Sequence, residues 1–273
     1  MQDILYCFDK NYNEQAITSI YSLLENSSKK LTIHVLHNEP NSLSNLIKLI
    51  DNHEKLEKIN LYMFKNDDYN FPKIDGSHVS KATYFRMFIE DYIDVKVKNI
   101  LYVDPDVVCL NSFNEIIESI CRDLNSLNKL ISVKTEHICN KNNKNLFDRL
   151  NISNKYFNAG IMVINYEKWV NSKIKNSLVD TSKEIENNIV YWDQDVMNKY
   201  LDGEYLELPM QLNQHPFNFK NSMDYFAKNT IFLHYSGKNK PWNKKGFKDK
   251  NSVFYKKFYE EVFKKKLTVS RSR

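Results

Sequence analysis

Apolar and polar positions along the chain follow two different periods. Runs that are apolar at nearly every position, as in strands buried on both faces, occur at Asp3–Phe8, Leu31–Leu36 and Ile59–Phe64. Between these runs, apolar residues recur at helical spacing over Glu14–Asn26 and Leu43–Leu56. Strands that alternate with helices in this way predict the α/β class, with a parallel sheet covered by helices on both faces.

The rest of the chain continues this alternation. Further strands are expected at Ile100–Val103, Leu130–Val133, Phe157–Asn165 and Thr230–Gly237, and further helices over His78–Tyr92, 111–130, Tyr166–Glu186 and Asp193–Leu201. The stretch 135–155 is polar and rich in asparagine, which predicts a loop and makes it the candidate for a mobile lid or an insertion. We expect one large domain, 1–242, followed by a tail, 243–273.

Two carboxylates directly follow one of the apolar strands. Asp104 and Asp106 stand one residue apart where Ile100–Val103 ends, and an apolar run resumes after them. Acids at the end of a buried strand are costly to desolvate unless a positive charge lies nearby, and this edge of an open α/β sheet is where ligands bind. A divalent cation with a phosphate-bearing substrate would account for the pair. A solvated boundary between strand and turn is the alternative.

Three more segments carry residues that suit a binding site. Asn158-Ala159-Gly160 either allows close approach of backbone or ligand, or marks a β-bulge. In Trp192-Asp193-Gln194-Asp195 the acids precede a helix, where they either serve a site or cap the helix N-terminus. His234 ends a strand and is followed by Gly237 and Lys240, which suits a metal ligand and a phosphate-binding cation on one loop. A histidine satisfied within the core is the alternative.

Arg86 is the remaining candidate for the site. It is the only arginine before position 122, and it lies on an otherwise apolar helix face. A guanidinium in that setting needs a carboxylate or a polar ligand as its partner. Both a bound substrate and a structural salt bridge satisfy this requirement.

The charge of the chain is unevenly distributed. The formal net charge is +5, but residues 238–273 carry 13 Lys/Arg against 3 Asp/Glu, so the rest of the chain is acidic on balance. Lysines alternate with aromatic residues in this tail, which suits the surface of an anionic membrane. A helix that packs its aromatics on the protein body is the alternative. Because the basic charge is confined to the tail and no nucleic-acid motif occurs, nucleic-acid binding is not expected.

Cysteine usage and the start of the chain bear on the compartment. The four cysteines, Cys7, Cys109, Cys121 and Cys139, show no C-x-x-C spacing, which predicts reduced thiols, with neither disulfides nor a zinc site. Cys7 and Cys109 lie in or beside apolar runs and are expected to be buried. No leader pattern and no membrane span of about 18 apolar residues occurs. We therefore expect a cytoplasmic protein, which the tail could hold peripherally on the inner face of the membrane.

Six segments, in this order and spacing, resemble glycosyltransferase family 8. These are retaining sugar transferases with the GT-A nucleotide-diphosphosugar fold, and they include the bacterial lipopolysaccharide galactosyl- and glucosyltransferases and glycogenin. The resemblance covers residues 3–242 and implies a mixed, mostly parallel central sheet flanked by helices. It rests on Phe8-Asp9-Lys10-Asn11-Tyr12, His78-Val79-Ser80…Tyr84…Arg86, Leu101-Tyr102-Val103-Asp104-Pro105-Asp106, Tyr156-Phe157-Asn158-Ala159-Gly160…Asn165…Trp169, Asp193-Gln194-Asp195 and His234…Gly237…Lys240-Pro241-Trp242.

The resemblance implies an activity and a role for each matching position. The enzyme would move galactose or glucose from UDP-galactose or UDP-glucose to a hydroxyl of a glycan, lipid-linked or protein-linked acceptor in bacterial surface glycan synthesis. Its cofactor would be Mn²⁺, with Mg²⁺ as the alternative, held by Asp104, Asp106 and His234. The donor would be bound by Cys7, Phe8, Asp9, Asn11, Tyr12, Arg86, Pro105, Asn158, Ala159, Asp193, Gln194, Gly237 and Lys240, together with the metal ligands. The catalytic residues would be Gln194, Asp193 and Asp195.

Some positions depart from the family pattern. Pro105 lies between the two acids, where small residues are usual, and fixes the turn without touching the carboxylates. Cys7 and Phe8 replace smaller residues at the nucleotide pocket, and Lys10 stands where an acid is often seen. These departures bear on base and sugar preference more than on the class of reaction.

The retaining mechanism has two forms. A covalent route needs a carboxylate on the face of the sugar opposite the leaving group, and Gln194, a neutral amide, is a poor nucleophile. Asp193 and Asp195 flank it in the sequence. Our hypothesis is attack on the same face, with the leaving phosphate helping to deprotonate the acceptor, and a sugar ester trapped on either aspartate would refute it.

Two other functions fit parts of the pattern. A nucleotide-sugar hydrolase or nucleotidyltransferase on a similar sheet usually has a Gly-rich phosphate loop after the first strand, and Asp9–Tyr12 contains no glycine. A non-catalytic protein that binds nucleotide sugars would have little reason to keep a complete metal set together with Lys240. Release of UDP that depends on Mn²⁺, with and without an acceptor, separates these functions.

Overall fold

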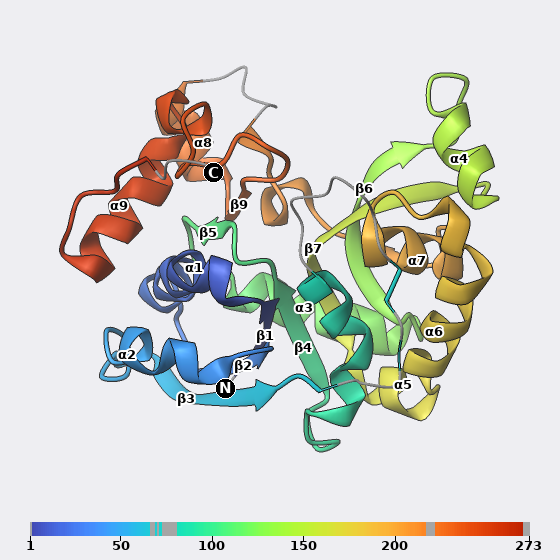
Figure 1. Ribbon diagram of the computed structural model, residues 1–273, viewed down its shortest axis with the longest axis horizontal. Coiled ribbons are helices and arrows are strands. Elements are labelled where there is room, and N and C mark those ends of the chain that lie inside the picture. Colours follow the sequence, from blue (N-terminus) through green and yellow to red (C-terminus); the bar gives the residue numbers. More distant parts are fainter. Residues whose placement is uncertain (1, 66–68, 70, 73–80, 217–221, 270–273) are drawn as a thin grey trace.

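The computed structural model describes residues 2–65, 69, 71–72, 81–216 and 222–269. Within these residues the chain forms a seven-stranded central sheet and a two-stranded sheet beside it (Figure 1). The central sheet has the strand order β3 (Leu56–Met63), β2 (Leu31–His37), β1 (Gln2–Phe8), β4 (Asn99–Val103), β7 (Lys155–Asn165), β6 (Ile131–Ile138) and β8 (Leu206–Glu207). The small sheet consists of β5 (Val107–Cys109) and β9 (Phe232–His234).

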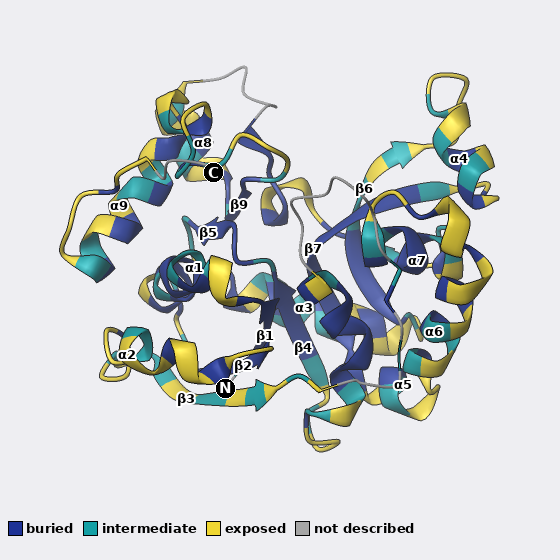
Figure 2. Ribbon diagram, in the orientation of Figure 1, coloured by how far each residue is buried: buried dark blue, intermediate teal, exposed yellow. Residues whose placement is uncertain are grey.

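The central sheet is mixed and mostly parallel, as expected. Strands β3, β2, β1 and β4 are parallel to one another, whereas β7 runs antiparallel to both β4 and β6, and β8 is parallel to β6. The strands in the middle of the sheet are buried along most of their length (Figure 2). This burial explains why the sequence shows them as nearly continuous apolar runs.

Helices cover both faces of the central sheet. The helices of the described residues are α1 (Asn13–Glu25), α2 (Ser44–Ile47), α3 (Asn114–Ser126), α4 (Lys144–Leu150), α5 (Tyr166–Asn171), α6 (Ile174–Glu184), α7 (Trp192–Leu201), α8 (Met223–Asn229) and α9 (Ser252–Phe263). Apolar side chains of α1 and α3 form one core with the first face. Those of the 3₁₀ helix Lys81–Asp91, α5, α6 and α7 form a second core with the other face.

Three helix predictions are wrong in extent. The helix expected over Leu43–Leu56 is only α2, because the chain enters a series of turns from Lys48 onward. The helix expected over His78–Tyr92 is a 3₁₀ helix, Lys81–Asp91, and residues 78–80 lie outside the described part of the chain. The helix expected over Tyr166–Glu186 is divided into α5 and α6, because Lys173 adopts a left-handed backbone conformation with φ of 52°.

The loop predicted over residues 135–155 is also wrong. Strand β6 continues to Ile138, α4 occupies Lys144–Leu150, and β7 begins at Lys155. Phe147 and Leu150 bury their side chains in the core, so α4 is held by apolar packing that the asparagine-rich composition obscures. The described residues of this stretch therefore form a hairpin with a short helix at its tip.

The aromatic residues of the basic tail pack on the protein body. In α9 the side chains of Tyr255, Phe258, Tyr259 and Val262 are buried, and the helix lies against α1 (Figure 1). This agrees with the second interpretation of the tail, a helix that buries its aromatics. None of the helices within the described residues combines the length and the apolar character needed to cross a membrane.

The cysteine environments give a simple test of this fold. Cys7 and Cys109 are buried, and burial raises the pKa of both thiols, while burial raises the pKa of Cys121 to about 11. Cys139 is exposed. Because the thiolate is the reactive species, we expect a thiol reagent such as Ellman's reagent to modify Cys139 first in the native protein. Cys139→Ser should remove the fast phase, and rapid modification of Cys7 or Cys109 would contradict the fold.

Candidate functional site

The two acids and the histidine that the sequence singled out come together beyond the end of β4. The turn Asp104-Pro105-Asp106 leads from β4 directly into β5. Strand β5 pairs antiparallel with β9, and the register places Val107 opposite His234. One possible ligand atom from each of Asp104, Asp106 and His234 lies within 4.8 Å of the others. We call these three residues the cation cluster.

The cation cluster has the chemistry of a metal site. His234 Nε2 lies 3.3 Å from Asp106 Oδ1 and 4.0 Å from Asp104 Oδ2. Asp106 Oδ1 is buried and has no hydrogen-bond partner within the described residues, which is costly unless a positive charge binds there. Two carboxylates with one imidazole suit a divalent transition metal better than Ca²⁺. The residues present therefore fit such a cation.

Lys240 neutralises the other oxygen of Asp106. Its ammonium group pairs with Asp106 Oδ2 and donates to the carbonyl oxygen of Tyr235 at 2.7 Å. Burial would raise the pKa of Asp106, but the ammonium group of Lys240 lowers it below its usual value. Burial likewise opposes the charge on Lys240, yet Asp106 raises the pKa of this amine. A permanent cation thus lies directly beside the cation cluster.

Arg86 is held by a buried ion pair that reaches the same cluster. It is 4% exposed and pairs with both oxygens of Asp193 through Nε and Nη2. Its Nη1 donates to the carbonyl oxygen of Ala159 at 2.7 Å and to Asp104 Oδ1 at 3.4 Å, and the guanidinium lies 4.5 Å from the centre of the Tyr102 ring. Burial raises the pKa of Asp193 to about 6 although Arg86 opposes the rise. The guanidinium of Arg86 thus opposes the burial that favours the neutral carboxyl.

Asp195 is buried with both of its oxygens occupied. Arg149 of α4 donates two hydrogen bonds, at 2.7 and 3.0 Å. The Tyr156 hydroxyl donates at 2.8 Å, and the backbone N–H groups of Val190 and Tyr191 donate at 2.7 Å each. This carboxylate joins α4, β7 and the chain before α7; it binds N–H groups that precede the helix, and no side chain caps the N-terminus of α7.

Gln194, on α7, contacts β7 at the segment Asn158-Ala159-Gly160. Its Oε1 accepts from the Ala159 N–H at 3.0 Å, and its Nε2 donates to the Tyr156 hydroxyl at 3.1 Å. Trp192, at the start of α7, has a φ of 47°, an uncommon backbone conformation for a bulky residue. The backbone therefore turns sharply at Trp192, directly before Asp193 and Gln194.

The residues expected in the uridine pocket follow β1. Asp9 accepts from the Asn11 N–H at 2.9 Å and caps a short 3₁₀ helix that ends at Tyr12. Tyr12 meets the ring of Trp242 edge-on, with centroids 6.1 Å apart. Phe8 and Cys7 are buried. Asp9, Asn11 and Tyr12 therefore lie at the carboxyl end of β1, while Phe8 and Cys7 are core residues behind them.

A small hollow adjoins the cation cluster. It has a volume of about 320 Å³ and is lined by Lys134, Thr135, Glu136, Asn158, His215, Ser236 and Gly237. His215 Nδ1 lies 2.5 Å from the Ser236 hydroxyl, and burial and the neighbouring His234 lower the pKa of His215 to about 3. Gly237 has a φ of 77°, which glycine adopts without strain. The hollow is polar and its histidine is neutral.

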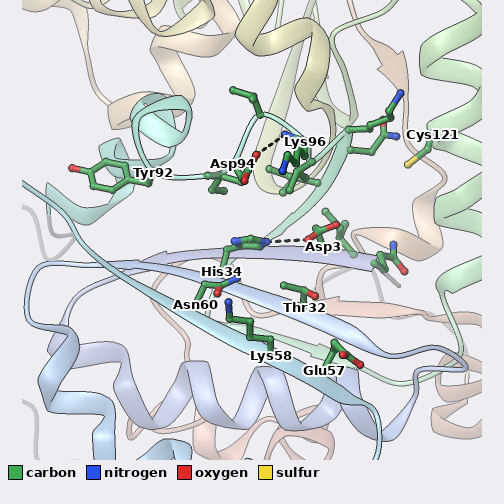
Figure 3. Close-up of a pocket in the computed structure, with 18 of the residues that line it drawn as sticks. Asp3, Thr32, His34, Glu57, Lys58, Asn60, Tyr92, Asp94, Lys96 and Cys121 are labelled. Carbon is green, nitrogen blue, oxygen red and sulfur yellow. Dashed lines mark hydrogen bonds and ion pairs between the residues drawn. The ribbon is translucent and has the colours of Figure 1, made fainter.

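A larger hollow lies elsewhere in the described part of the chain. It has a volume of about 1340 Å³ and is lined partly by residues that begin the parallel strands, such as Asp3 and Thr32 (Figure 3). There His34 Nε2 is 3.0 Å from Asp3 Oδ1, and Asp94 Oδ1 accepts from the Lys96 N–H at 2.8 Å. Its acids are thus engaged with neighbours, and the cation cluster lies at the opposite ends of the strands.

Sequence reasoning missed three residues that hold the site. Asn213 contacts His234, Tyr102 donates to Asp104 Oδ1, and Arg149 binds Asp195. Tyr102 stands in the quoted motif, two positions before Asp104, so alternation along the strand could have indicated it. The other two partners are distant in sequence and carry no local signal. His78, Val79 and Ser80, which were part of the resemblance, lie outside the described residues.

Comparison with known proteins identifies the family. Residues 3–246 match the family model described as glycosyl transferase family 8. The chain belongs to this family. The family and the GT-A fold predicted from the motifs are therefore confirmed, and so is an enzyme that transfers glycosyl groups.

The relatives of this family 8 chain support the predicted class of hexosyltransferases. A lipopolysaccharide 1,2-glucosyltransferase of Escherichia coli is 27% identical over 261 residues, which cover 88% of this chain and 73% of that protein. A lipopolysaccharide 1,3-galactosyltransferase of Salmonella typhimurium is 29% identical over 267 residues, covering 89% and 74%. The structure of the galactosyltransferase LgtC with donor and acceptor sugar analogues matches with a TM-score of 0.76 at 20% identity, covering 95% and 96%. This structural likeness concerns the fold.

Gly160 gives a direct test of the cation cluster. A Cβ at this position would overlap the His234 ring and lie 2.9 Å from Asp104 Oδ2. We therefore expect Gly160→Ala to push the two ligands apart and to weaken Mn²⁺ binding by tenfold or more, measured by isothermal titration calorimetry. Ile161→Val, on the next residue of β7, is the matched control and should bind Mn²⁺ as the wild type does. Unchanged binding in Gly160→Ala would show that the cluster is not the cation site.

Proposed function

We propose that this family 8 enzyme is a Mn²⁺-dependent retaining hexosyltransferase that uses UDP-galactose or UDP-glucose. The observation that carries the proposal is the convergence of Asp104, Asp106 and His234 beside Lys240 at the carboxyl end of the sheet. Its glucosyl- and galactosyltransferase relatives support these two donor sugars. The acceptor would be a glycan, lipid-linked or protein-linked hydroxyl in bacterial surface glycan synthesis.

The residues around the cluster suit the departure of UDP. Asp104, Asp106 and His234 would hold Mn²⁺, with Mg²⁺ as the alternative, and the bound cation would supply positive charge next to the diphosphate. Lys240 would turn from Asp106 to the diphosphate as negative charge grows there, since only interactions that strengthen in the transition state accelerate the reaction. Asp9, Asn11 and Tyr12 would line the uridine pocket, with Phe8 and Cys7 shaping it from behind.

The donor sugar would lie between the diphosphate and the start of α7. Arg86, Asn158, Ala159, Asp193 and Gln194 would surround it, with Gln194 near the reacting carbon. Both oxygens of Asp193 pair with Arg86, and both oxygens of Asp195 are occupied as well. A carboxylate engaged in this way is a poor nucleophile, which supports attack on the same face over a covalent sugar ester. Asp193 and Asp195 would then position Gln194 and Arg86.

The small hollow would receive the acceptor hydroxyl. It is lined by both Asn158, which is proposed to contact the sugar, and Gly237, which is proposed to contact the diphosphate. Same-face attack requires the acceptor to enter beside the leaving phosphate, and a hollow between these two residues would allow that. Its neutral His215 is not suited to remove the acceptor proton at neutral pH because its pKa is about 3. The leaving phosphate would take the proton instead.

Release of UDP from a panel of UDP-sugars tests the function. We expect release from UDP-galactose or UDP-glucose that requires Mn²⁺, is abolished by EDTA and is stimulated by an acceptor. Asp104→Ala and Asp106→Ala should each lower kcat/KM by roughly 100-fold or more, because each removes a cation ligand. Asp180→Ala, which changes an exposed acid on α6, should retain full activity.

The same assay separates the alternatives. Fast release that acceptors never stimulate would indicate a hydrolase, and binding of UDP-sugar without release would indicate a non-catalytic protein. Trapping of a sugar ester on Asp193 or Asp195, detected by mass spectrometry of the denatured protein, would refute same-face attack.

The basic tail is proposed to hold the enzyme at the cytoplasmic face of an anionic membrane. Lys257, Lys264 and Lys266 are exposed and form no ion pair within the described residues. Each lysine near an anionic surface contributes about 1 kcal/mol. We therefore expect wild-type protein to float with vesicles that contain phosphatidylglycerol, and reversal of all three lysines to glutamate to abolish flotation.

A matched variant controls for charge alone. Reversal of three exposed lysines elsewhere, Lys48, Lys141 and Lys183, should leave flotation with phosphatidylglycerol vesicles unchanged. Vesicles of phosphatidylcholine should not bind any of the three proteins. Equal flotation of both reversal variants would mean that the tail has no special part in membrane attachment.

A further inference from the structure

A hydrogen-bond relay runs from the backbone of β7 to the imidazole of the cation cluster. The Gly160 N–H donates to Asn158 Oδ1 at 3.0 Å, so this oxygen acts as an acceptor. Asn213 contacts the same oxygen at 3.1 Å, and only its Nδ2 is able to donate there. The remaining atom, Asn213 Oδ1, lies 3.0 Å from His234 Nδ1.

This relay decides which nitrogen of His234 carries the proton. Since Asn213 Oδ1 is an acceptor, Nδ1 must be the donor, and the neutral ring is left with its lone pair on Nε2. Nε2 is the nitrogen that faces the cluster, 3.3 Å from Asp106 Oδ1. The ring is therefore in the tautomer that offers Nε2 to a cation. The opposite tautomer would leave Asn213 Oδ1 facing a second lone pair.

The members of the relay are buried. Asn213 is 0% exposed, His234 3% and Asn158 8%. The position of Asn213 is fixed by the backbone of the next residue. The Gln214 N–H donates to the Phe232 carbonyl at 3.0 Å, and the His234 N–H donates to the Gln214 carbonyl at 2.9 Å. These two bonds lay the chain after Asn213 alongside β9 and bring its side chain to the His234 ring.

We propose that Asn213 is a positioning residue that selects the Nε2-ligating tautomer of His234 and fixes the ring direction. The inference rests on the proposed cation site and adds a residue that acts through His234 rather than on the substrate. Partners of this kind typically change metal affinity 10- to 100-fold when they are removed. Asn213 therefore contributes to Mn²⁺ affinity through the imidazole alone.

A double-mutant cycle on the full chain tests this coupling. Mn²⁺ alone is titrated into wild type, Asn213→Ala, His234→Ala and the double variant, and free Mn²⁺ is measured by electron paramagnetic resonance. We expect Asn213→Ala to weaken binding 10- to 100-fold when His234 is present and to have no effect when His234 is absent. Asn165→Ala is the matched control, because it removes a buried asparagine at the other end of β7, about 23 Å from the relay member Asn158 by strand geometry.

A second variant and a spectroscopic readout guard against a folding defect. Asn213→Asp keeps an oxygen that accepts from Nδ1–H, so it should bind Mn²⁺ more tightly than Asn213→Ala. Long-range ¹H–¹⁵N NMR of the imidazoles should show His234 as the Nδ1–H tautomer in wild type and lose that preference in Asn213→Ala.

The outcomes separate this inference from the proposed function. Equal Mn²⁺ affinity of wild type and Asn213→Ala would overturn the relay alone, as would an equal loss with and without His234. Failure of wild type and Asn165→Ala to bind Mn²⁺ would overturn the cation site and the relay together.

Discussion

The antiparallel pairing of β5 with β9 is the constraint on which the site depends. Strand β5 starts directly after Asp106, and β9 ends on His234, so the register of this short pair sets the distance between the acids and the imidazole. A slip of one residue would turn His234 to the opposite face. Apart from His234, all residues of the two strands are apolar and fully buried. This packing holds the register in place.

Charge pairing then divides the buried acids of the site into two groups. Asp193 pairs with Arg86 and Asp195 with Arg149, and each pair uses both carboxylate oxygens. Breaking a buried pair leaves an uncompensated charge, so these acids are fixed in place. Asp106, by contrast, gives one oxygen to Lys240 and turns the other, which has no hydrogen-bond partner in the described structure, toward His234 Nε2. The acids that remain able to bind a cation are therefore those that follow β4.

Much of the fold and part of the site could be predicted from the sequence, because both depend on local patterns. Continuous apolar runs indicated the parallel strands, and acids placed directly after a strand indicated the ligand edge. The prediction failed where tertiary packing overrode composition, as at α4, whose Leu146, Phe147 and Leu150 are the few apolar residues of an asparagine-rich stretch. It also failed for Asn213, since an asparagine in a segment without a clear period looks like any other loop residue until Gln214 pairs with β9.

Gly160 shows why two interpretations of one motif need not compete. The pairing of β6 with β7 is irregular opposite this segment, as the β-bulge interpretation expects. Yet Gly160 also accepts from the Asp104 N–H at 2.8 Å, donates to Asn158 Oδ1, and has no Cβ to displace the His234 ring. The same residue thus fixes the turn of the acids, starts the relay to the imidazole and leaves room for the ring. The irregular pairing there is compatible with a site that has room for backbone atoms, but not for a side chain, between Asp104 and His234.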